Sequence, residues 1–367
     1  MFEPRVALTI APAIILGALL IVAPRISRRG LLFGVYVGEA AARGEAASRI
    51  TRAWTLRMLL ALGLTCAAGI TIAMLDRTVW AVPITTFLLL IGFYWAYVDA
   101  HRQSRALAAP APSVSVGALA PPSPVKLVLP FAALAVVFGL AASAAVYGAM
   151  QYESLPDKIP LHFALNGEAD RWVAKSPEAV FLLPALNLLV SGMLCGVAFL
   201  IANAKRSLRH ERKGISLDAQ IRFHQALTLI ICVLAILLSV LLAAATFSMI
   251  QVGLGHASRL SLATMIGGGS IGVLAVGMIA LVALRYGQGG SKLERDVEDA
   301  PLTGGLADNR HWYLGLIYFN REDPSLLIER RFGIGYTVNF GNWKAVAILV
   351  GLLVLALGVP IVSRTAL

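Results

Sequence analysis

Three side chains that could bind a cation lie close together in the segment 155–175. They are His162, Glu168 and Asp170. Imidazole nitrogens and carboxylate oxygens are common ligands of divalent metal ions. One histidine with two carboxylates is also typical of a solvated, hydrogen-bonded loop, in which His162 would tie the loop down. The sequence therefore gives a weak candidate for a metal site beside a structural interpretation, and nothing in it indicates a cofactor.

The segment around these side chains reads as a short extended run, a turn at Asn166-Gly167, and a second run. Asn-Gly between two such runs is typical of a β-hairpin turn. We expect a structured external loop over 150–178. Its candidate ligand-binding or structural residues are Pro160, His162, Phe163, Gly167, Glu168, Asp170, Arg171, Trp172 and Lys175.

Motifs of known enzyme active sites are missing from the sequence. There is no His-Glu-x-x-His and no Gly-x-Ser-x-Gly, and the glycine cluster 287–292 lacks the spacing of a phosphate-binding loop. Ionisable side chains in the middle of a membrane helix usually mark a proton or ion path. The most central polar residue of the apolar segments is Asn187, which we expect to hydrogen-bond between helices. No catalytic residue is predicted, and an enzyme is disfavoured.

The composition indicates that the membrane is the solvent of this chain. Hydrophobic residues make up 58% of 367 positions and charged residues 14%, outside the range of soluble domains. The apolar residues fall in blocks of about 20, long enough to cross the hydrocarbon layer as a helix. We predict an all-α polytopic membrane protein of about eight transmembrane helices. The predicted spans are 6–23, 57–75, 78–98, 127–149, 179–202, 223–250, 259–284 and 345–363.

The basic residues predict the orientation of these spans. If the N-terminus lies outside, the loops 24–57, 99–126, 203–222 and 285–344 are cytoplasmic and hold 24 of the 31 lysines and arginines. Loop 203–222 alone has six, whereas the longer loop 150–178 has three. We therefore expect both termini outside the cytoplasmic membrane. The net charge of +11 serves orientation and contact with lipid headgroups, and nucleic-acid binding is not expected.

Loop lengths and composition predict how the chain is divided. A Pro- and Ala-rich segment at 107–126 reads as an extended linker. It would separate three N-terminal helices in 1–106 from a helix-loop-helix in 127–202. Two further helices follow in 203–284, then a cytoplasmic loop at 285–344 and the last helix in 345–367.

Residues 312–341 alternate as strands do. The pattern predicts a strand at 312–319, a polar turn at 320–324, and strands at 326–328 and 333–340. We interpret this segment as a small β-containing cytoplasmic element with aromatic side chains at headgroup depth. Its candidate residues are Tyr318, Asn320, Asp323, Pro324, Arg331, Gly333 and Asn339.

These two segments carry a resemblance to a known family. Residues 155–172 follow the pattern Leu-Pro-x-x-Ile-Pro-x-His-Phe-x-x-x-Gly-x-x-Asp-x-Trp, with Lys175 and Pro184 downstream, and resemble bacterial membrane proteins similar to the SdpI immunity protein. The match covers roughly residues 128–200. Segment 312–341 resembles a second uncharacterised domain that often accompanies the first. Near the N-terminus, Phe33-Gly34-Val35 resembles a further element of the family, with Tyr36 and Gly38 departing from its pattern.

The resemblance implies a role in immunity. The characterised branch of the family protects its own membrane against a secreted toxic peptide and sequesters a transcriptional repressor at the membrane. For this chain, that implies a peptide toxin as an external partner and a cytoplasmic regulator as an internal one, beside the lipid bilayer. The sequence does not indicate an oligomeric state.

Three functions follow from these patterns. The first is binding and signalling, with the external loop sensing or neutralising an amphipathic peptide. The second is a transporter or channel for a small or lipid-like solute through the helix bundle. The third is a metal-dependent enzyme at the external face that uses His162, Glu168 and Asp170. The absence of a catalytic set between two structured loops favours the first.

Overall fold

The computed structural model describes residues 4–75, 78–110, 117–118, 124–164, 166–204, 206–207, 213–293, 306 and 308–365. Within these residues, seven helices are long and apolar enough to cross a membrane. They belong to α1 Pro4–Ile26, α3 Glu45–Met74, α4 Thr78–Arg105, α5 Pro124–Gln151, α6 Pro177–Ala202, α7 Lys213–Gly253 and α8 Leu262–Tyr286. A further helix, α9 Trp343–Thr365, contains a shorter described apolar stretch, Trp343–Val354. The chain is a multi-pass helical membrane protein with a few small β-hairpins.

The long helices keep most of their apolar surface outside the protein. In each span, a third of the residues or fewer are buried against other parts of the chain. Large side chains such as Leu64, Phe87, Trp95 and Phe138 are more than half exposed. In water such a surface would be unstable, whereas in a bilayer the lipid chains cover it.

Several helices extend further than their hydropathy predicts. The predicted loop 24–57 contains a hairpin of β1 Leu31–Leu32 and β2 Val35–Tyr36, a short helix α2 Glu39–Arg43, and the first turns of α3. Helix α7 likewise begins at Lys213, ten residues before its predicted span. Hydropathy marks only the part of a helix that suits hydrocarbon, and a helix can continue beyond it as a polar stretch. The Arg49–Glu45 pair, one helical turn apart, supports such a stretch at the start of α3.

The chain divides into two compact units. Unit 1 comprises residues 1–120, 205–223 and 283–342, and unit 2 comprises 121–204, 224–282 and 343–367. Unit 1 therefore combines the first three long helices with a segment that lies late in the sequence. Most of the predicted linker 107–126 lies outside the described residues. Its described part includes β3 Gly117–Ala118, which pairs with β6 Arg206–Ser207.

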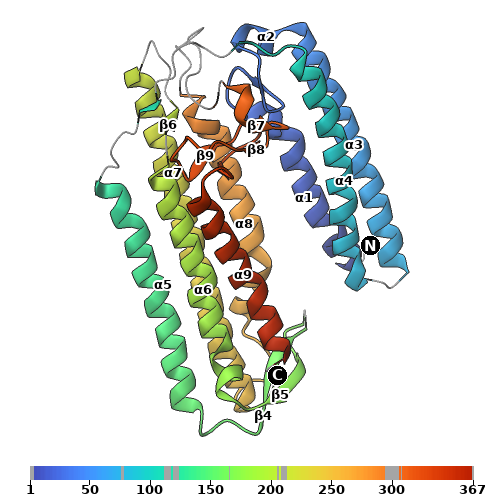
Figure 1. The fold of residues 1–367 in the computed structure, drawn as a ribbon. Coiled ribbons are helices and arrows are strands. Elements are labelled where there is room, and N and C mark those ends of the chain that lie inside the picture. The colour runs from blue at the N-terminus through green and yellow to red at the C-terminus, as the bar shows by residue number, and fades with distance from the viewer. Residues whose placement is uncertain are drawn as a thin grey trace. The chain divides into compact units, whose positions relative to one another are not determined.

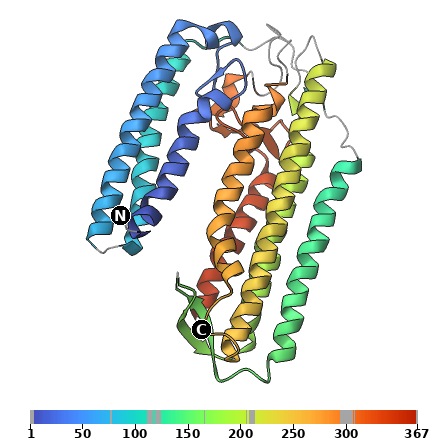
Figure 2. The same cartoon turned by 180° about the vertical axis from the view of Figure 1, so that it is seen from behind.

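Unit 1 is built on the helices α1, α3 and α4, which lie side by side in both ribbon views (Figures 1 and 2). Its core is a cluster of aromatic rings. Phe33 and Phe332 stack at 5.7 Å between ring centroids, and both contact Trp54 and Tyr97. Because Phe332 comes from the late segment, this segment shares one core with the N-terminal helices.

The late segment of unit 1 forms two short hairpins. Strand β7 Trp312–Tyr313 pairs with β8 Ile317–Tyr318, and β9 Leu327–Glu329 pairs with β10 Tyr336–Val338. The predicted β-containing element is present, but the single strand expected at 312–319 is wrong. The chain reverses in the three-residue connection 314–316, in which Leu314 and Gly315 have positive φ.

Unit 2 contains α5, α6, the larger parts of α7 and α8, and α9. A hairpin of β4 Lys158–Phe163 and β5 Ala169–Ala174 connects α5 to α6 at one end of the unit, and α9 ends there as well (Figure 1). Helix α6 begins where Ser176 accepts a hydrogen bond from the amide of Ala179, with Pro177 in the first turn. Inside the unit, the amide of Asn187 donates to the carbonyl of Ser239 at 3.0 Å, which joins α6 to α7 as the sequence predicts.

Candidate functional site

The external segment folds as the hairpin β4–β5, with the turn at Asn166-Gly167 that the sequence predicts. Ile159 lies opposite Val173, and Pro160 opposite Trp172. The register shifts on both sides of His162. Gly167 has φ of 83°, a conformation that favours glycine. The chain therefore places its predicted site residues on a defined two-stranded element.

The base of the hairpin is fastened to the helices of unit 2. Leu155 and Ile159 are buried in one apolar cluster with residues of α6 and α7. The ammonium group of Lys175 donates to the carbonyl of Leu155 at 2.8 Å and lies over the ring of Tyr152. These contacts hold both strand ends against the bundle.

The tip of the hairpin is fastened separately. The amide of Leu260, in the connection between α7 and α8, donates to the carbonyl of Gly167 at 2.8 Å. A Cβ atom at Gly167 would lie 2.6 Å from the sulfur of Met265, so a side chain there would require Met265 to move. Because both its base and its tip are held, the hairpin has a fixed position on the helices of unit 2.

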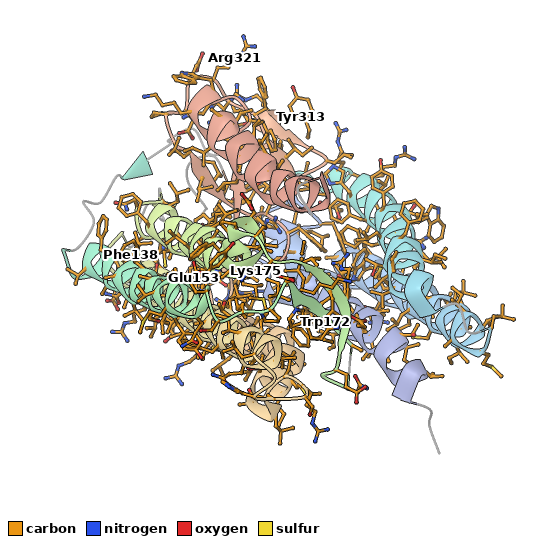
Figure 3. The ribbon with its side chains drawn as sticks, turned by 90° about the horizontal axis from the view of Figure 1, so that it is seen from below. Phe138, Glu153, Trp172, Lys175, Tyr313 and Arg321 are labelled. Atoms are coloured by element: carbon orange, nitrogen blue, oxygen red, sulfur yellow. The ribbon has the colours of Figure 1, made fainter. Side chains whose placement is uncertain are left out.

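The hairpin exposes charged and aromatic side chains. Asp170, Arg171 and Trp172 are three consecutive exposed residues of β5, and the Trp172 side chain is 46% exposed. Figure 3 shows Trp172 on the strand and Lys175 closer to α6. Pro160, the cross-strand partner of Trp172, is buried, and Phe163 is partly buried.

Only two of the three candidate metal ligands come together. His162 Nδ1 lies 2.5 Å from Asp170 Oδ1 across the hairpin. Glu168 instead accepts a hydrogen bond from the side-chain amide of Asn166 at 2.8 Å. Within the described part of the chain, no group of three or more His, Cys, Asp or Glu side chains is arranged to hold a metal ion. The geometry of His162 and Asp170 is that of a hydrogen-bonded pair that links the two strands.

We expect Lys175→Met to loosen the base of the hairpin. The substitution removes a charged donor from the Leu155 carbonyl, and a hydrogen bond of this kind contributes about 1–3 kcal/mol. The expected result is faster cleavage within 158–174 by proteinase K in detergent-solubilised protein. Lys158→Met is the matched control because Lys158 is an exposed lysine of the same hairpin. Equal cleavage rates in the two variants would contradict the anchoring role.

The candidate residues of the late segment form a network within unit 1. The side chain of Asn339 donates to the carbonyls of Asn320 and Asp323, each at 2.9 Å, and its oxygen accepts from the Asn320 amide. The Tyr318 hydroxyl donates to Asp323 at 3.1 Å. Burial raises the pKa of Tyr318 to about 12, so this hydroxyl keeps its proton at neutral pH. The carbonyl of Pro324 accepts from Asn342 at 2.9 Å. These residues fix the polar turn between the two hairpins.

Arg331 and Gly333 connect this network to the N-terminal hairpin and helix. The buried guanidinium of Arg331 donates to the carbonyl of Gly34 at 3.1 Å and lies over the ring of Trp312. Burial lowers the pKa of Arg331. The amide of Gly333 donates to the hydroxyl of Ser27 at 2.8 Å. The candidate residues of this segment therefore hold the late hairpins against the start of the chain.

A buried ion pair at the same junction was not predicted from the sequence. Arg28 donates to Glu329 at 2.7 Å, and both side chains are almost completely buried. Gly289 lies so close that a Cβ atom there would collide with Glu329. The two partners are separated by 301 positions, and neither lies in a motif with known spacing. The sequence indicated the two regions separately, through the family-like Phe33-Gly34-Val35 element close to Arg28 and through the predicted segment 312–341 that contains Glu329, but not the contact between them.

The fold and these two structured segments define a multi-pass helical membrane protein with two domains of unknown function. Residues 139–188 match the family model "Domain of unknown function (DUF1648)", which covers the end of α5, the hairpin β4–β5 and the first half of α6. Residues 321–346 match "Family of unknown function (DUF5808)", which covers β9, β10 and the first turn of α9. No curated protein and no solved structure matches the chain. Both family matches overlap the segments that the sequence motifs identified.

Proposed function

We propose that this chain is an SdpI-like immunity and sensing protein of a bacterial membrane that binds an amphipathic peptide at the hairpin β4–β5. The observation that supports the proposal most strongly is the exposed Trp172 on a hairpin fastened at base and tip. A rigid aromatic side chain between charged neighbours offers apolar area without a large loss of side-chain entropy on binding. Asp170 and Arg171 supply both signs of charge beside it.

The strand edges of the hairpin suit an extended ligand. Within the described residues, β4 and β5 form a sheet of their own, and one bridge between Glu168 and Arg259 extends it at the tip. A free strand edge can accept an extended peptide through main-chain hydrogen bonds. A peptide that pairs with β5 would bring its apolar side chains onto Trp172.

The topology that this function needs has eight spans with both termini outside. Helix α9 has 23 residues, enough to cross the hydrocarbon layer, and we propose it as the eighth span. In unit 2, the hairpin, the connection after α7 and the end of α9 lie at the same end, which supports a common external side (Figure 1). In this topology the β7–β10 segment of unit 1 faces the cytoplasm.

The β7–β10 segment would then hold a cytoplasmic regulator. Its exposed surface includes Tyr313, Ile317 and Phe319, of which Tyr313 is 61% exposed. Figure 3 shows Tyr313 and Arg321 on the outer side of this segment. Exposed aromatic side chains next to a cation are common at protein interfaces.

The test of the proposed function is a comparison of strains challenged with a panel of amphipathic peptide toxins. We expect deletion of the gene to reduce survival and Trp172→Ala to reduce it to a similar degree at matched protein levels. Trp343→Ala is the matched control, since Trp343 is 74% exposed and begins α9 at the other end of unit 2. Unchanged survival of the deletion and Trp172→Ala strains against every peptide would contradict the proposal.

A further inference from the structure

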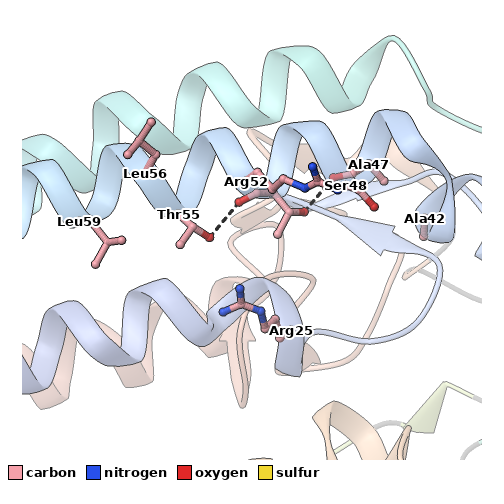
Figure 4. A pocket seen from close by; sticks show the side chains of 9 residues that line it. Arg25, Ala42, Ala47, Ser48, Arg52, Thr55, Leu56 and Leu59 are labelled. Carbon is pink, nitrogen blue, oxygen red and sulfur yellow. Dashed lines mark hydrogen bonds between the residues drawn. The ribbon is translucent and has the colours of Figure 1, made fainter.

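A groove of about 460 Å³ lies between α1 and α3 of unit 1, outside both segments discussed above. Figure 4 shows Arg25 extending from α1 toward α3, with Arg52 and Ser48 on the facing side. Toward the other end, the wall of the groove is formed by Leu56 and Leu59 of α3. One end of the groove is therefore cationic and the other apolar.

Among the described residues, the two arginines differ from their neighbours Arg43 and Arg49 in having no acidic partner. Arg43 pairs with Glu39, and Arg49 pairs with Glu45, each within one helical turn. Within the part of the chain that the structure describes, no ion pair or hydrogen bond is formed by the guanidinium of Arg25 or of Arg52. Two guanidinium groups facing one groove repel each other, and an anion between them would remove that repulsion.

Of the hydroxyl groups that line the groove, one can donate a hydrogen bond to a ligand. Thr51 and Thr55 donate to carbonyls of their own helix, at 2.9 Å each. Ser48 forms no side-chain hydrogen bond to the described residues, and it lies one turn before Arg52 on the same helix. A hydroxyl donor beside two guanidinium groups matches the acceptor oxygens of a phosphate.

The apolar wall indicates the source of that phosphate. Leu56 and Leu59 lie about 6 and 10 Å beyond Arg52 along α3, at 1.5 Å per residue. Both are more than half exposed, and α3 is a candidate membrane span from Glu45 to Met74. The cationic end of the groove lies at the ends of the helices, where lipid headgroups would be, and its apolar wall continues toward the membrane interior, where the acyl chains would be. This arrangement matches a phospholipid.

We propose that this groove binds the phosphate group of an anionic phospholipid between Arg25 and Arg52, with an acyl chain along Leu56 and Leu59. A soluble phosphate could make the same contacts with the two guanidinium groups. Only a lipid would also use the apolar wall. The site is separate from the peptide-binding hairpin, and neither proposal depends on the other.

The test is native mass spectrometry of the full chain in detergent, titrated with phosphatidylglycerol, phosphatidylcholine or inorganic phosphate. We expect retained phosphatidylglycerol, and at least a tenfold weaker apparent affinity in the double variant Arg25→Gln/Arg52→Gln. The matched control is Arg43→Gln/Arg49→Gln, which removes the same charge from the same unit and should bind as the wild type does. An unchanged elution volume and melting temperature without lipid exclude loss of the fold.

Three results would overturn the proposal. Equal losses in the two double variants would show that lipid is held by surface charge in general. Equal retention of phosphatidylcholine would show that the anionic headgroup is not recognised. Displacement of the lipid by millimolar inorganic phosphate, together with full lipid binding in Leu56→Ser/Leu59→Ser, would assign the groove to soluble phosphate. Weaker lipid binding in the leucine variant, with phosphate failing to compete, supports the lipid.

Discussion

Glu329→Gln is expected to lower the stability of unit 1 by about 3–5 kcal/mol, because it removes the negative charge that lies 2.7 Å from the buried guanidinium of Arg28. Removal of one member of a buried ion pair costs more than the pair itself contributes, since the remaining charge cannot reach water. The measurement is the temperature at which half of the detergent-solubilised protein is lost from its size-exclusion peak. We expect this temperature to fall by several degrees or more.

The control for this prediction is Glu45→Gln, which removes the acidic partner of an exposed pair in the same unit. Glu45 and Arg49 are 84% and 69% exposed, so water can replace their interaction. Little change in the melting temperature is expected. A third variant, Arg28→Met/Glu329→Met, removes both buried charges and should recover part of the lost stability. If Glu329→Gln and Glu45→Gln had the same melting temperature, the buried pair would not stabilise unit 1.

The membrane spans were predictable because one physical quantity determines them. A helix that crosses hydrocarbon needs about 20 apolar residues, so hydropathy alone located the seven helices of the described chain that are long and apolar enough to span a membrane. Predicted ends were close for α6, at 179–202 against Pro177–Ala202. They were far off for α3 and α7, whose first turns are polar and helical. Hydropathy cannot predict the polar helical turns that continue beyond the hydrocarbon layer.

The hairpin β4–β5 was predictable for a local reason as well. Asn166-Gly167 supplies the turn, and the sequence before and after it reads as extended runs. The pairing of His162 with Asp170, and the exclusion of Glu168 from it, was not predictable. The register shifts around His162, and such an irregularity changes which side chains face one another.

The sequence did not predict which segments of the chain combine to form unit 1. Its core joins Phe33 to Phe332, and its buried ion pair joins Arg28 to Glu329. Contacts between residues so far apart leave no periodic pattern in a single sequence. The turn at Leu314-Gly315 was missed for a local reason, because leucine rarely adopts positive φ and only one of the two residues is glycine.

The turn at Leu314-Gly315 carries the second large prediction. It meets a matching turn at Phe33-Gly34, and in the described chain Phe33 and Leu314 are the non-glycine residues with positive φ. The hydroxyl of Tyr97 donates to the carbonyls of Phe33 and Leu314, at 3.1 and 2.9 Å. Two strained turns are thus clamped together by one tyrosine, and the closest approach between them is backbone to backbone at the glycines.

We expect Gly315→Ala to destabilise unit 1 by about 2–5 kcal/mol. A Cβ atom at this position would lie 2.5 Å from the Cα of Gly34, a contact that forces the backbone to move. Overpacking of this kind costs about 1–3 kcal/mol, and the left-handed conformation of a residue with a side chain costs about 1–2 kcal/mol more. The measurement is again the melting temperature in detergent, with proteolysis of the β7–β10 segment as a second readout.

Gly333→Ala separates the two causes. Gly333 has φ of 76°, close to the 66° of Gly315, but the nearest atom to an added Cβ is 3.9 Å away. It therefore carries only the cost of the left-handed conformation, about 1–2 kcal/mol. A larger loss in Gly315→Ala than in Gly333→Ala would assign the difference to the contact between the two turns. Equal losses would mean that the close contact between the two turns adds no cost of its own, and that the other contacts of the late segment hold it in place.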